Sequence, residues 1–342
     1  MRSVKVVVTW DLGQEAMDVI GSEGPYVEAV LVPYVESTHT RDLRRKNRLD
    51  ELAAKVPPVS AQLLDHLRNA EIIFGLDYPS DLPSLAPNLR WVQMLGAGTD
   101  HLHGTGLLES DVVITTVGGF GSRAIAEYVI NQMLCYAKQT RAYIAAEERQ
   151  AWTLLWADTL AGKTVGIVGL GRIGSAVAHL CKAFDMRVLA TRRSPTQETH
   201  PCVDQILPAS RLSDMLPQCD YVVVTAALTA ETRNMLGEDE IRLMKDKAFI
   251  VNVARGEIIN EEALIAALQE GRIDGAGLDV FAQEPLPPDS PLWRLPNVSV
   301  TPHGSAAIVD YGARAARYFA DNLTRYLAGE PLTGVVDKER GY

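Results

Sequence analysis

Three glycines at fixed spacing follow a short apolar run near the middle of the chain, and they constrain its fold more than any other feature. The run at 164–168 carries no charge, and Gly169, Gly171 and Gly174 come directly after it. An uncharged run of this kind predicts a strand buried on both faces, as in a parallel sheet. The glycines fit a tight turn, the close approach of a pyrophosphate to backbone, and close packing of a helix on the strand. The segment therefore predicts a dinucleotide-binding unit.

The residues after the glycines support this interpretation. Apolar side chains recur at helical spacing at Ile173, Ala176, Val177, Leu180, Cys181 and Phe184. This spacing predicts a helix whose N-terminal dipole faces the phosphates. The alternative is a chance match in a glycine-rich loop, but a strand before the motif and a helix after it favour binding.

Composition limits the partners of the chain. With 342 residues, 47% of them hydrophobic, the length predicts about two domains. A net charge of -10 argues against binding to nucleic acid or to an anionic membrane. The four cysteines form no CxxC pair, and no apolar run has the length of a signal peptide or membrane span. We therefore expect a cytoplasmic protein with reduced thiols, no membrane partner and no metal.

Strand-like runs alternate with helix-like ones along the chain, which predicts parallel sheets. The predicted strands of the first series lie at 4–9, 29–32, 72–74 and 91–94. Those of the second series lie at 164–168, 187–190, 221–225, 248–252, 275–280 and 298–300. Six parallel strands with intervening helices are typical of the doubly wound dinucleotide fold. The fold class is therefore α/β with two doubly wound parallel-sheet domains.

The predicted helices suggest how the domains are connected. An apolar helix at 124–137 separates the two series, and a final helix at 306–327 ends before Gly329. Because that last helix follows the second sheet, it could fold back onto the first domain. We expect a Rossmann nucleotide-binding domain at 106–303, inserted into a flavodoxin-like substrate domain made of 1–105 and 304–342. The segment 38–55 mixes charges of both signs, which predicts a solvated helix or loop rather than a binding patch.

The residues after the second Rossmann strand bear on the choice of nucleotide. An acidic residue there would accept the ribose hydroxyls of NAD, but this chain has Arg192, Arg193 and Ser194. Guanidinium groups form forked bonds to phosphate, so these residues favour the 2′-phosphate of NADP over NAD. The alternative is that both arginines are ordinary surface charges.

Three polar residues follow buried strands on the side where this fold binds its ligands. They are Arg255, Glu284 and His303. A guanidinium can hold a carboxylate, a histidine can move a proton near neutral pH, and a neighbouring carboxylate can orient the ring and favour its charged form. A lone histidine is more often a surface residue, but the three together are what reduction of a 2-keto acid requires.

At this point the chain resembles the D-isomer-specific 2-hydroxyacid dehydrogenases, a family that includes glyoxylate/hydroxypyruvate reductases and phosphoglycerate dehydrogenases. The resemblance rests on LGAGTD (95–100), AE (126–127), GKT (162–164), LTAET (228–232), NVARGE (252–257), LDVFAQEP (278–285), TPH (301–303) and VD (336–337). These ordered matches span most of the chain.

The resemblance implies roles for the three polar residues. Arg255 would orient the keto acid by its carboxylate and carbonyl. His303 would protonate the carbonyl oxygen as hydride arrives from the nicotinamide, and would act as base in reverse. Glu284 would stabilise the charged imidazole.

It also implies a cofactor site. Asp279 would meet the nicotinamide carboxamide, Ala254 would lie on the same wall, and Arg172 and Ile173 would lie under the pyrophosphate. The full set of expected cofactor residues is Gly169, Gly171, Arg172, Ile173, Gly174, Arg192, Arg193, Ser194, Ala227, Thr232, Val253, Ala254 and Asp279. Ala227 stands where members often have proline, and the charge of Glu257, where a small or apolar residue is common, is unexplained.

The substrate is expected to contact the first domain. The amides of Ala97 and Gly98 would form a nest for its carboxylate, unless this is a plain glycine turn. Tyr78 would either line the pocket for the substrate side chain or lie at its rim. Trp152, Trp156 and Trp293 would be dimer contacts, as family members pair through the nucleotide domain, or simple core residues.

The resulting expectation is an NADP-preferring homodimeric oxidoreductase that converts a small 2-keto acid to the D-2-hydroxy acid. A nucleotide-sensing corepressor-type binding protein on the same fold is the alternative from another class, and phosphite or formate oxidation is a more distant one. Turnover of NADPH with glyoxylate or hydroxypyruvate discriminates the first two.

Overall fold

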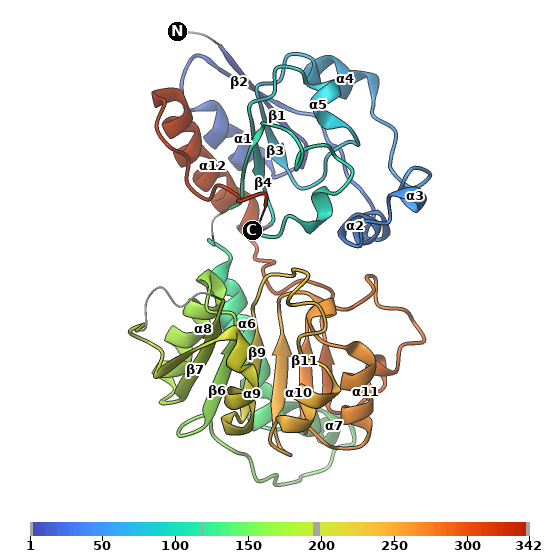
Figure 1. Cartoon of the computed structure of the whole chain (residues 1–342), viewed down its shortest axis with the longest axis vertical. Coiled ribbons are helices and arrows are strands. Elements are labelled where there is room, and N and C mark those ends of the chain that lie inside the picture. The colour runs from blue at the N-terminus through green and yellow to red at the C-terminus, as the bar shows by residue number, and fades with distance from the viewer. Residues whose placement is uncertain (1–2, 118, 194–198, 340–342) are drawn as a thin grey trace. The chain divides into compact units, whose positions relative to one another are not determined.

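The computed structural model describes residues 3–117, 119–193 and 199–339. The chain forms two compact units, one of Met1–Phe120 with Ile308–Tyr342 and the other of Gly121–Ala307 (Figure 1). Each unit is built on one parallel sheet with helices on both faces. Among the described residues, no helix is both long and apolar enough to cross a membrane.

The first unit holds a sheet of five parallel strands in the order β2-β1-β3-β4-β5. The strands are β1 (Val4–Val8), β2 (Val27–Leu31), β3 (Ile72–Gly75), β4 (Trp91–Met94) and β5 (Val113–Thr115). This is the flavodoxin-like order, and the direction of winding reverses between β1 and β3. The expected flavodoxin-like domain is therefore present.

Helices cover both faces of this sheet and bury its apolar residues. They are α1 (Gln14–Gly21), α2 (Thr38–Arg45), α3 (Leu49–Leu52), α4 (Ala61–Leu67), α5 (Leu82–Leu85) and α12 (Tyr311–Ala328). On one face, Phe319 of α12 stacks on Phe74 and Trp91 at centroid distances of 4.6 and 5.1 Å. The last helix begins at Tyr311 rather than at the expected residue 306, and it ends at Gly329 with φ 70°. Only glycine adopts that left-handed conformation readily.

The charged segment around α2 differs from its expected solvated state. Arg44 is fully buried and holds both carboxylate oxygens of Glu36, at 2.8 and 2.7 Å. A third nitrogen, Nη1, donates to the carbonyl of His103 at 2.8 Å. A charge pattern cannot reveal this, because the partners of Arg44 come from outside the helix and satisfy a cation that would otherwise need water.

The second unit holds a sheet of seven parallel strands in the order β12-β11-β10-β9-β6-β7-β8. The strands are β6 (Thr164–Val168), β7 (Arg187–Arg192), β8 (Gln205–Pro208), β9 (Tyr221–Val224), β10 (Phe249–Asn252), β11 (Gly275–Leu278) and β12 (Val298–Val300). The order contains the Rossmann arrangement, with one further strand at the β12 edge. Six of these strands were expected, and β8 was not.

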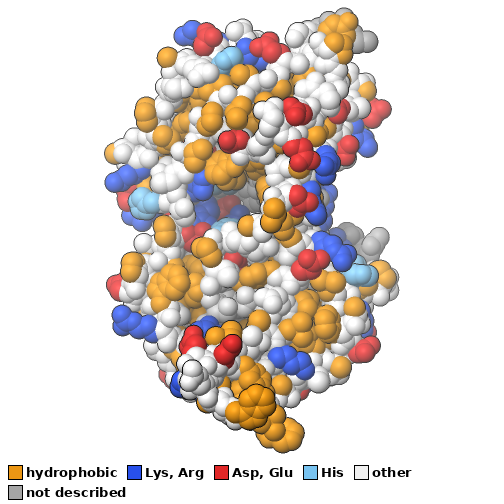
Figure 2. All heavy atoms as spheres, turned by 180° about the vertical axis from the view of Figure 1, so that it is seen from behind, with side chains coloured by type: hydrophobic (Ala, Val, Ile, Leu, Met, Phe, Trp, Pro, Cys, Tyr) orange, Lys and Arg blue, Asp and Glu red, His pale blue; other side chains and the backbone are white. Residues whose placement is uncertain are grey.

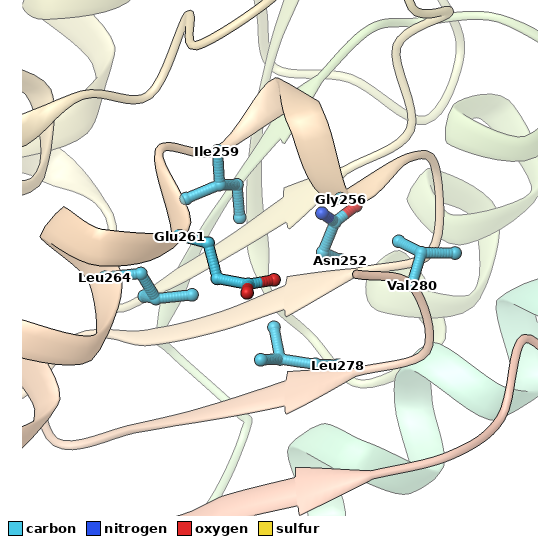
Figure 3. A pocket seen from close by; sticks show the side chains of 7 residues that line it. All are labelled: Asn252, Gly256, Ile259, Glu261, Leu264, Leu278 and Val280. Atoms are coloured by element: carbon cyan, nitrogen blue, oxygen red, sulfur yellow. The ribbon is translucent and has the colours of Figure 1, made fainter. Parts of the chain in front are cut away.

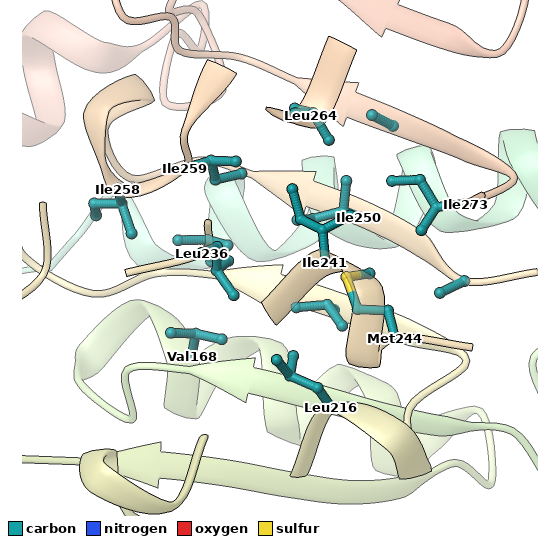
Figure 4. Packing of buried hydrophobic residues seen from close by; sticks show 14 of the residues in the cluster. Val168, Leu216, Leu236, Ile241, Met244, Ile250, Ile258, Ile259, Leu264 and Ile273 are labelled. Carbon is teal, nitrogen blue, oxygen red and sulfur yellow. The ribbon is translucent and has the colours of Figure 1, made fainter. Parts of the chain in front are cut away.

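Helices again lie on both faces of the second sheet. They are α6 (Ser122–Ala137), α7 (Thr140–Glu148), α8 (Arg172–Ala183), α9 (Leu212–Met215), α10 (Glu238–Leu243) and α11 (Glu261–Gln269). One core cluster packs α6 and α8 on the sheet, and another packs α9, α10 and α11 on it. In Figure 4, side chains such as Ile241, Ile250 and Leu264 of the latter cluster interdigitate between helices and strands. These layers leave the carboxyl ends of the strands to the loops that carry polar residues.

The boundaries between the two units lie later in the chain than expected, after residues 120 and 307 rather than after 105 and 303. The first difference has a clear cause. Strand β5 pairs with β4, and the backbone of Thr116 donates to Gly334, so the segment after residue 105 completes the first sheet.

Candidate active site

Two of the expected catalytic side chains meet at the carboxyl ends of β11 and β12. His303 Nδ1 lies 3.0 Å from Glu284 Oε2, with the histidine side chain 43% exposed and the glutamate 7%. Because an ionised carboxylate only accepts, the geometry places the proton on Nδ1. Among the described residues, Nε2 has no hydrogen-bond partner. The ring is therefore fixed at one nitrogen, and its other nitrogen remains available for proton exchange.

The backbone of His303 is held in an uncommon conformation. Its φ is 53°, in the left-handed region that residues other than glycine seldom adopt. Asp279 secures it: the carbonyl oxygen of Asp279 accepts the His303 amide at 2.8 Å, and its carboxylate accepts the amides of Gly304 and Ser305 at 2.8 and 2.9 Å. Such strained backbone persists where the surroundings over-determine it, and functional sites are where it concentrates.

Asp279, which was expected to meet the nicotinamide carboxamide, makes several hydrogen bonds within its own unit. The side chain is fully buried, and Oδ1 also accepts the hydroxyl of Thr301 at 2.6 Å. The hydroxyl of Tyr128 on α6 lies 2.7 Å from the Thr301 hydroxyl. Burial, the main cause, raises the pKa of Tyr128 to about 12, so this phenol keeps its proton at neutral pH. These bonds describe a residue that positions the loop carrying His303.

Arg255 follows β10 in a turn built by Asn252. The Asn252 side chain accepts the Ala254 amide at 3.0 Å and donates to the Arg255 carbonyl at 2.9 Å. The guanidinium of Arg255 donates to the Ala254 carbonyl at 2.8 Å and is partly exposed. Because β10, β11 and β12 are neighbouring parallel strands, Arg255 lies at the same edge of the sheet as Glu284 and His303.

The dinucleotide motif has the geometry expected of its three glycines. A Cβ on Gly169 would lie 2.6 Å from the Ala226 backbone, and one on Gly174 would lie 2.4 Å from the Gly169 carbonyl oxygen. A Cβ on Gly171 would meet no atom within 4 Å. Two glycines thus allow close packing, and the third leaves open space at the start of α8. The residues present fit a dinucleotide, whose pyrophosphate requires that space and the helix N-terminus.

The other expected cofactor residues lie along the same edge. Arg172 and Ile173 begin α8, and Val253 and Ala254 form the buried turn before Arg255. The hydroxyl of Thr232, another expected cofactor residue, donates to the Ala227 carbonyl at 2.7 Å and so shapes the loop between them.

The residues expected at the 2′-phosphate lie at the end of β7. Arg192 is partly exposed, and Arg193 forms an ion pair with Glu231 at 3.0 Å. Ser194, expected beside them, lies outside the described residues.

The expected substrate residues of the first unit have different surroundings. Ala97 is exposed and Gly98 partly so, and among the described residues their amides have no acceptor. Tyr78 instead lies in the core, and its hydroxyl donates to the Gly75 and Gln93 carbonyls at 2.7 and 3.3 Å. That burial differs from the expected place in a pocket or at its rim, and it identifies Tyr78 as a packing residue.

Several site residues were not predicted. Thr301 and Gly256 lie inside recognised motifs, but their roles depend on contacts distant in sequence, as does that of Tyr128. Glu257, whose charge was unexplained, is buried, with Oε1 4.0 Å from Arg233 Nη1. Among the described residues, its other carboxylate oxygen has no hydrogen-bond partner.

Comparison with known proteins identifies the family. Residues 130–305 match the model of the D-isomer specific 2-hydroxyacid dehydrogenase NAD-binding domain. The chain belongs to this family. A glyoxylate reductase from Thermofilum pendens is 33% identical over 298 residues, covering 83% of this chain and 86% of the relative. A glyoxylate/hydroxypyruvate reductase B from Yersinia pestis is 34% identical, with 80% of this chain and 86% of the relative covered.

Solved structures agree with this family. A D-isomer specific 2-hydroxyacid dehydrogenase from Xanthobacter autotrophicus Py2, in complex with NADPH and MES, superposes with a TM-score of 0.80 at 28% identity, covering 99% of this chain and 100% of the other. An NADPH-dependent glyoxylate/hydroxypyruvate reductase from Sinorhizobium meliloti, in complex with NADP and sulfate, gives a TM-score of 0.79 at 28% identity with the same coverage. This 2-hydroxyacid dehydrogenase is therefore an oxidoreductase that uses a nicotinamide dinucleotide. Its described residues contain no group of three or more His, Cys, Asp or Glu side chains suited to a metal ion.

Proposed function

We propose that this protein reduces a small 2-keto acid, of the size of glyoxylate or hydroxypyruvate, to the D-2-hydroxy acid with NADPH, using His303 as general acid. The observation that carries the proposal is the His303–Glu284 pair, in which one ring nitrogen is bonded and the other is available. The names of the relatives, glyoxylate reductase and glyoxylate/hydroxypyruvate reductase, support the substrate class.

Each residue has a separate task in the reaction. The nicotinamide, when bound, supplies the hydride. Arg255 holds the substrate carboxylate and orients the carbonyl, because a guanidinium binds such groups through paired charge-assisted hydrogen bonds. His303 donates the Nε2 proton to the carbonyl oxygen, and Glu284 stabilises the charged ring before transfer. Asp279 holds the His303 loop, and the amides of Ala97 and Gly98 supply further donors for the substrate carboxylate.

The proposed preference for NADPH rests on the end of β7. Arg192 and Arg193 stand where a carboxylate would favour NAD, and two related structures contain NADPH or NADP. A 2′-phosphate would compete with Glu231 for Arg193. The exposed ion pair is a small obstacle, since pairs of this kind contribute about 0–1 kcal/mol.

Two substitutions test the reaction. We expect Arg255→Ala to raise KM and lower kcat together, because the guanidinium orients the substrate as well as binding it. We expect His303→Gln mainly to lower kcat, by about 10²- to 10⁴-fold, the usual contribution of general acid catalysis. The measurement is steady-state oxidation of NADPH with glyoxylate and hydroxypyruvate. Unchanged turnover in the His303→Gln variant, or a wild-type protein that binds NADPH without turning over, contradicts the proposal.

A second experiment tests the nucleotide preference. We expect kcat/KM to be higher with NADPH than with NADH, and the Arg192→Ala/Arg193→Ala double variant to lose that difference by raising KM for NADPH alone. Equal use of both nucleotides by the wild type contradicts the preference without affecting the reaction itself.

We also propose that the second unit pairs with a second copy of the chain. Trp152 and Trp156 lie between α7 and β6 and are 105% and 87% exposed. The backbone beside them is anchored, since the Tyr143 hydroxyl accepts the Leu155 amide and donates to its carbonyl, both at 3.1 Å. Figure 2 shows hydrophobic side chains projecting at the end of this unit that carries α7. Anchored, exposed tryptophans are typical of protein interfaces.

A further inference from the structure

The turn after β11 is held by two carboxylates that accept consecutive backbone amides. Glu284 Oε1 accepts the Phe281 amide at 3.2 Å, which leaves Oε2 facing His303. Glu261 Oε2 accepts the next amide, that of Ala282, at 2.9 Å. Glu261 is the first residue of α11, so this bond ties a helix to the turn across 21 positions of the chain.

The same turn is packed against the backbone next to Arg255. A Cβ added to Gly256 would lie 1.9 Å from the carbonyl carbon of Phe281 and 2.3 Å from the Ala282 nitrogen. The Phe281–Ala282 peptide is therefore fixed from one side by contact with Gly256 and from the other by the Glu261 carboxylate. Neither constraint involves the catalytic side chains directly.

The surroundings of Glu261 strengthen its bond. Figure 3 shows its carboxylate pointing from the start of α11 toward the ends of β10 and β11, into a small cavity. Leu264, Leu278 and Val280 line that cavity together with Asn252. In a largely apolar setting a charge-assisted hydrogen bond is stronger than in water, and a lost acceptor is not readily replaced by solvent.

We infer that Glu261 is a positioning residue for catalysis, which holds the Phe281–Ala282 peptide so that Glu284 stays within hydrogen-bond distance of His303. This inference rests on the proposed role of His303. Without the acceptor, the peptide can rotate and carry Glu284 away from the ring. The protonated form of His303 then loses its carboxylate partner.

The charges around His303 determine how this loss is detected. Arg255 follows β10, and Asp279 and Glu284 follow β11. The hydroxyl of Tyr128 on α6 is hydrogen-bonded to that of Thr301. Asp279 is occupied by amides and a hydroxyl, so Glu284 is the carboxylate that bonds the ring. Displacement of Glu284 disfavours the protonated ring, and reduction of the keto acid needs that form.

The test compares Glu261→Ala, Glu261→Gln and the control Glu262→Ala, made in the exposed neighbour on the first turn of α11. We expect Glu261→Ala to lower kcat about tenfold, the worth of one hydrogen bond to a charged group. Its alkaline fall in reductase activity should move to lower pH, with little change in KM for NADPH. Glu261→Gln keeps an oxygen that accepts the Ala282 amide, so it should restore most of the activity and the wild-type pH profile. Glu262→Ala controls for the charge at the helix N-terminus.

The following outcomes distinguish the explanations. A folded Glu261→Ala protein with the pH profile of the Glu262→Ala control overturns the inference, as does a Gln variant that behaves like Ala. If Glu261→Ala does not fold, the Gln variant decides: a wild-type pH profile supports the acceptor role, and a fall in activity at lower pH than in the Glu262→Ala control counts against it. Retention of wild-type turnover by His303→Gln instead refutes the proposed function.

Discussion

At the scale of single residues, two carboxylates of the candidate site accept hydrogen bonds from backbone amides and so fix its loops. Asp279 and Glu261 each accept amides from the loops that carry His303 and Glu284. A backbone amide that donates to such a carboxylate cannot turn without losing its acceptor. In the proposed mechanism, the position of the His303 ring is therefore set by carboxylates that do not themselves react.

The glycines of the dinucleotide motif lead to a first prediction. We expect Gly174→Ala to destabilise the protein by about 1–3 kcal/mol, because its Cβ meets a carbonyl oxygen and crowding of that kind forces the backbone to shift. Gly171→Ala should leave the free energy of unfolding unchanged and weaken NADPH binding about tenfold, since its Cβ enters space left for the pyrophosphate. Urea denaturation and fluorescence titration measure the two effects. Equal effects of the two variants on the free energy of unfolding would contradict the assignment of Gly174 to packing and Gly171 to nucleotide binding.

The cysteines give a second prediction. All four are free, and burial raises the pKa of Cys181 and of Cys219 to about 12. An ordinary thiol ionises near pH 8.5. We expect a thiol reagent at pH 9 to modify the partly exposed Cys135 and Cys202 in the native protein, and the other two only after unfolding. Mass spectrometry of the labelled peptides checks this, and rapid native labelling of Cys181 would contradict it.

The sequence allowed the positions of the candidate catalytic residues to be predicted better than their surroundings. The location of Arg255, Glu284 and His303 at one edge could be predicted because each follows a buried run, and the carboxyl ends of parallel strands meet at one edge. The burial of Tyr78 and the internal hydrogen bonds of Asp279 could not, because each depends on partners far away in the chain. A tyrosine after a strand has the same local pattern whether its hydroxyl faces solvent or a buried carbonyl.

At the scale of elements, most strands were predictable from their apolar runs, but the edge strands β8 and β5 were not. Strand β8 has four residues, is partly exposed and ends in Pro208, so it has neither a continuous apolar run nor clear alternation. Strand β5 has three residues at the edge of its sheet. Helix α2 shows the complementary difficulty, since its charged residues indicate exposure although Arg44 and Glu36 form a buried pair.

This pair supports a prediction about α2. We expect Arg44→Met to destabilise the first unit by about 3–5 kcal/mol, because it leaves the Glu36 carboxylate buried without its cation. The double variant Glu36→Leu/Arg44→Met should recover much of that loss, since it removes both charges. Urea unfolding followed by circular dichroism compares the two proteins. A double variant as unstable as the single one would show that the fold needs the charges themselves.

At the scale of the whole molecule, the chain forms two units with separate cores, each built on its own parallel sheet. The second unit, Gly121–Ala307, is inserted in the sequence between the two segments of the first. The periodic strands and the last helix predicted this insertion, although β5 extends the first unit further along the chain than expected.

The dimer proposal is tested by the tryptophans. We expect the double variant Trp152→Ser/Trp156→Ser to sediment as a monomer, because exposed anchors of this kind carry much of an interface's binding energy. Trp293→Ser is the matched control: Trp293 is also exposed, but its ring nitrogen donates to the Pro287 carbonyl at 2.9 Å within its own unit. Analytical ultracentrifugation distinguishes the cases. A wild-type protein that is monomeric at micromolar concentration contradicts the proposal.

The stacking of Phe319 on Phe74 and Trp91 has a consequence for synthesis on the ribosome. The first sheet emerges early, but the face that α1 covers in part is completed only when α12 has been translated. The inserted unit, Gly121–Ala307, is complete before that point. The nascent chain therefore exposes aromatic surface on its oldest segment while a later segment is already able to fold. We expect a chaperone to bind this aromatic surface in the interval before α12 is translated.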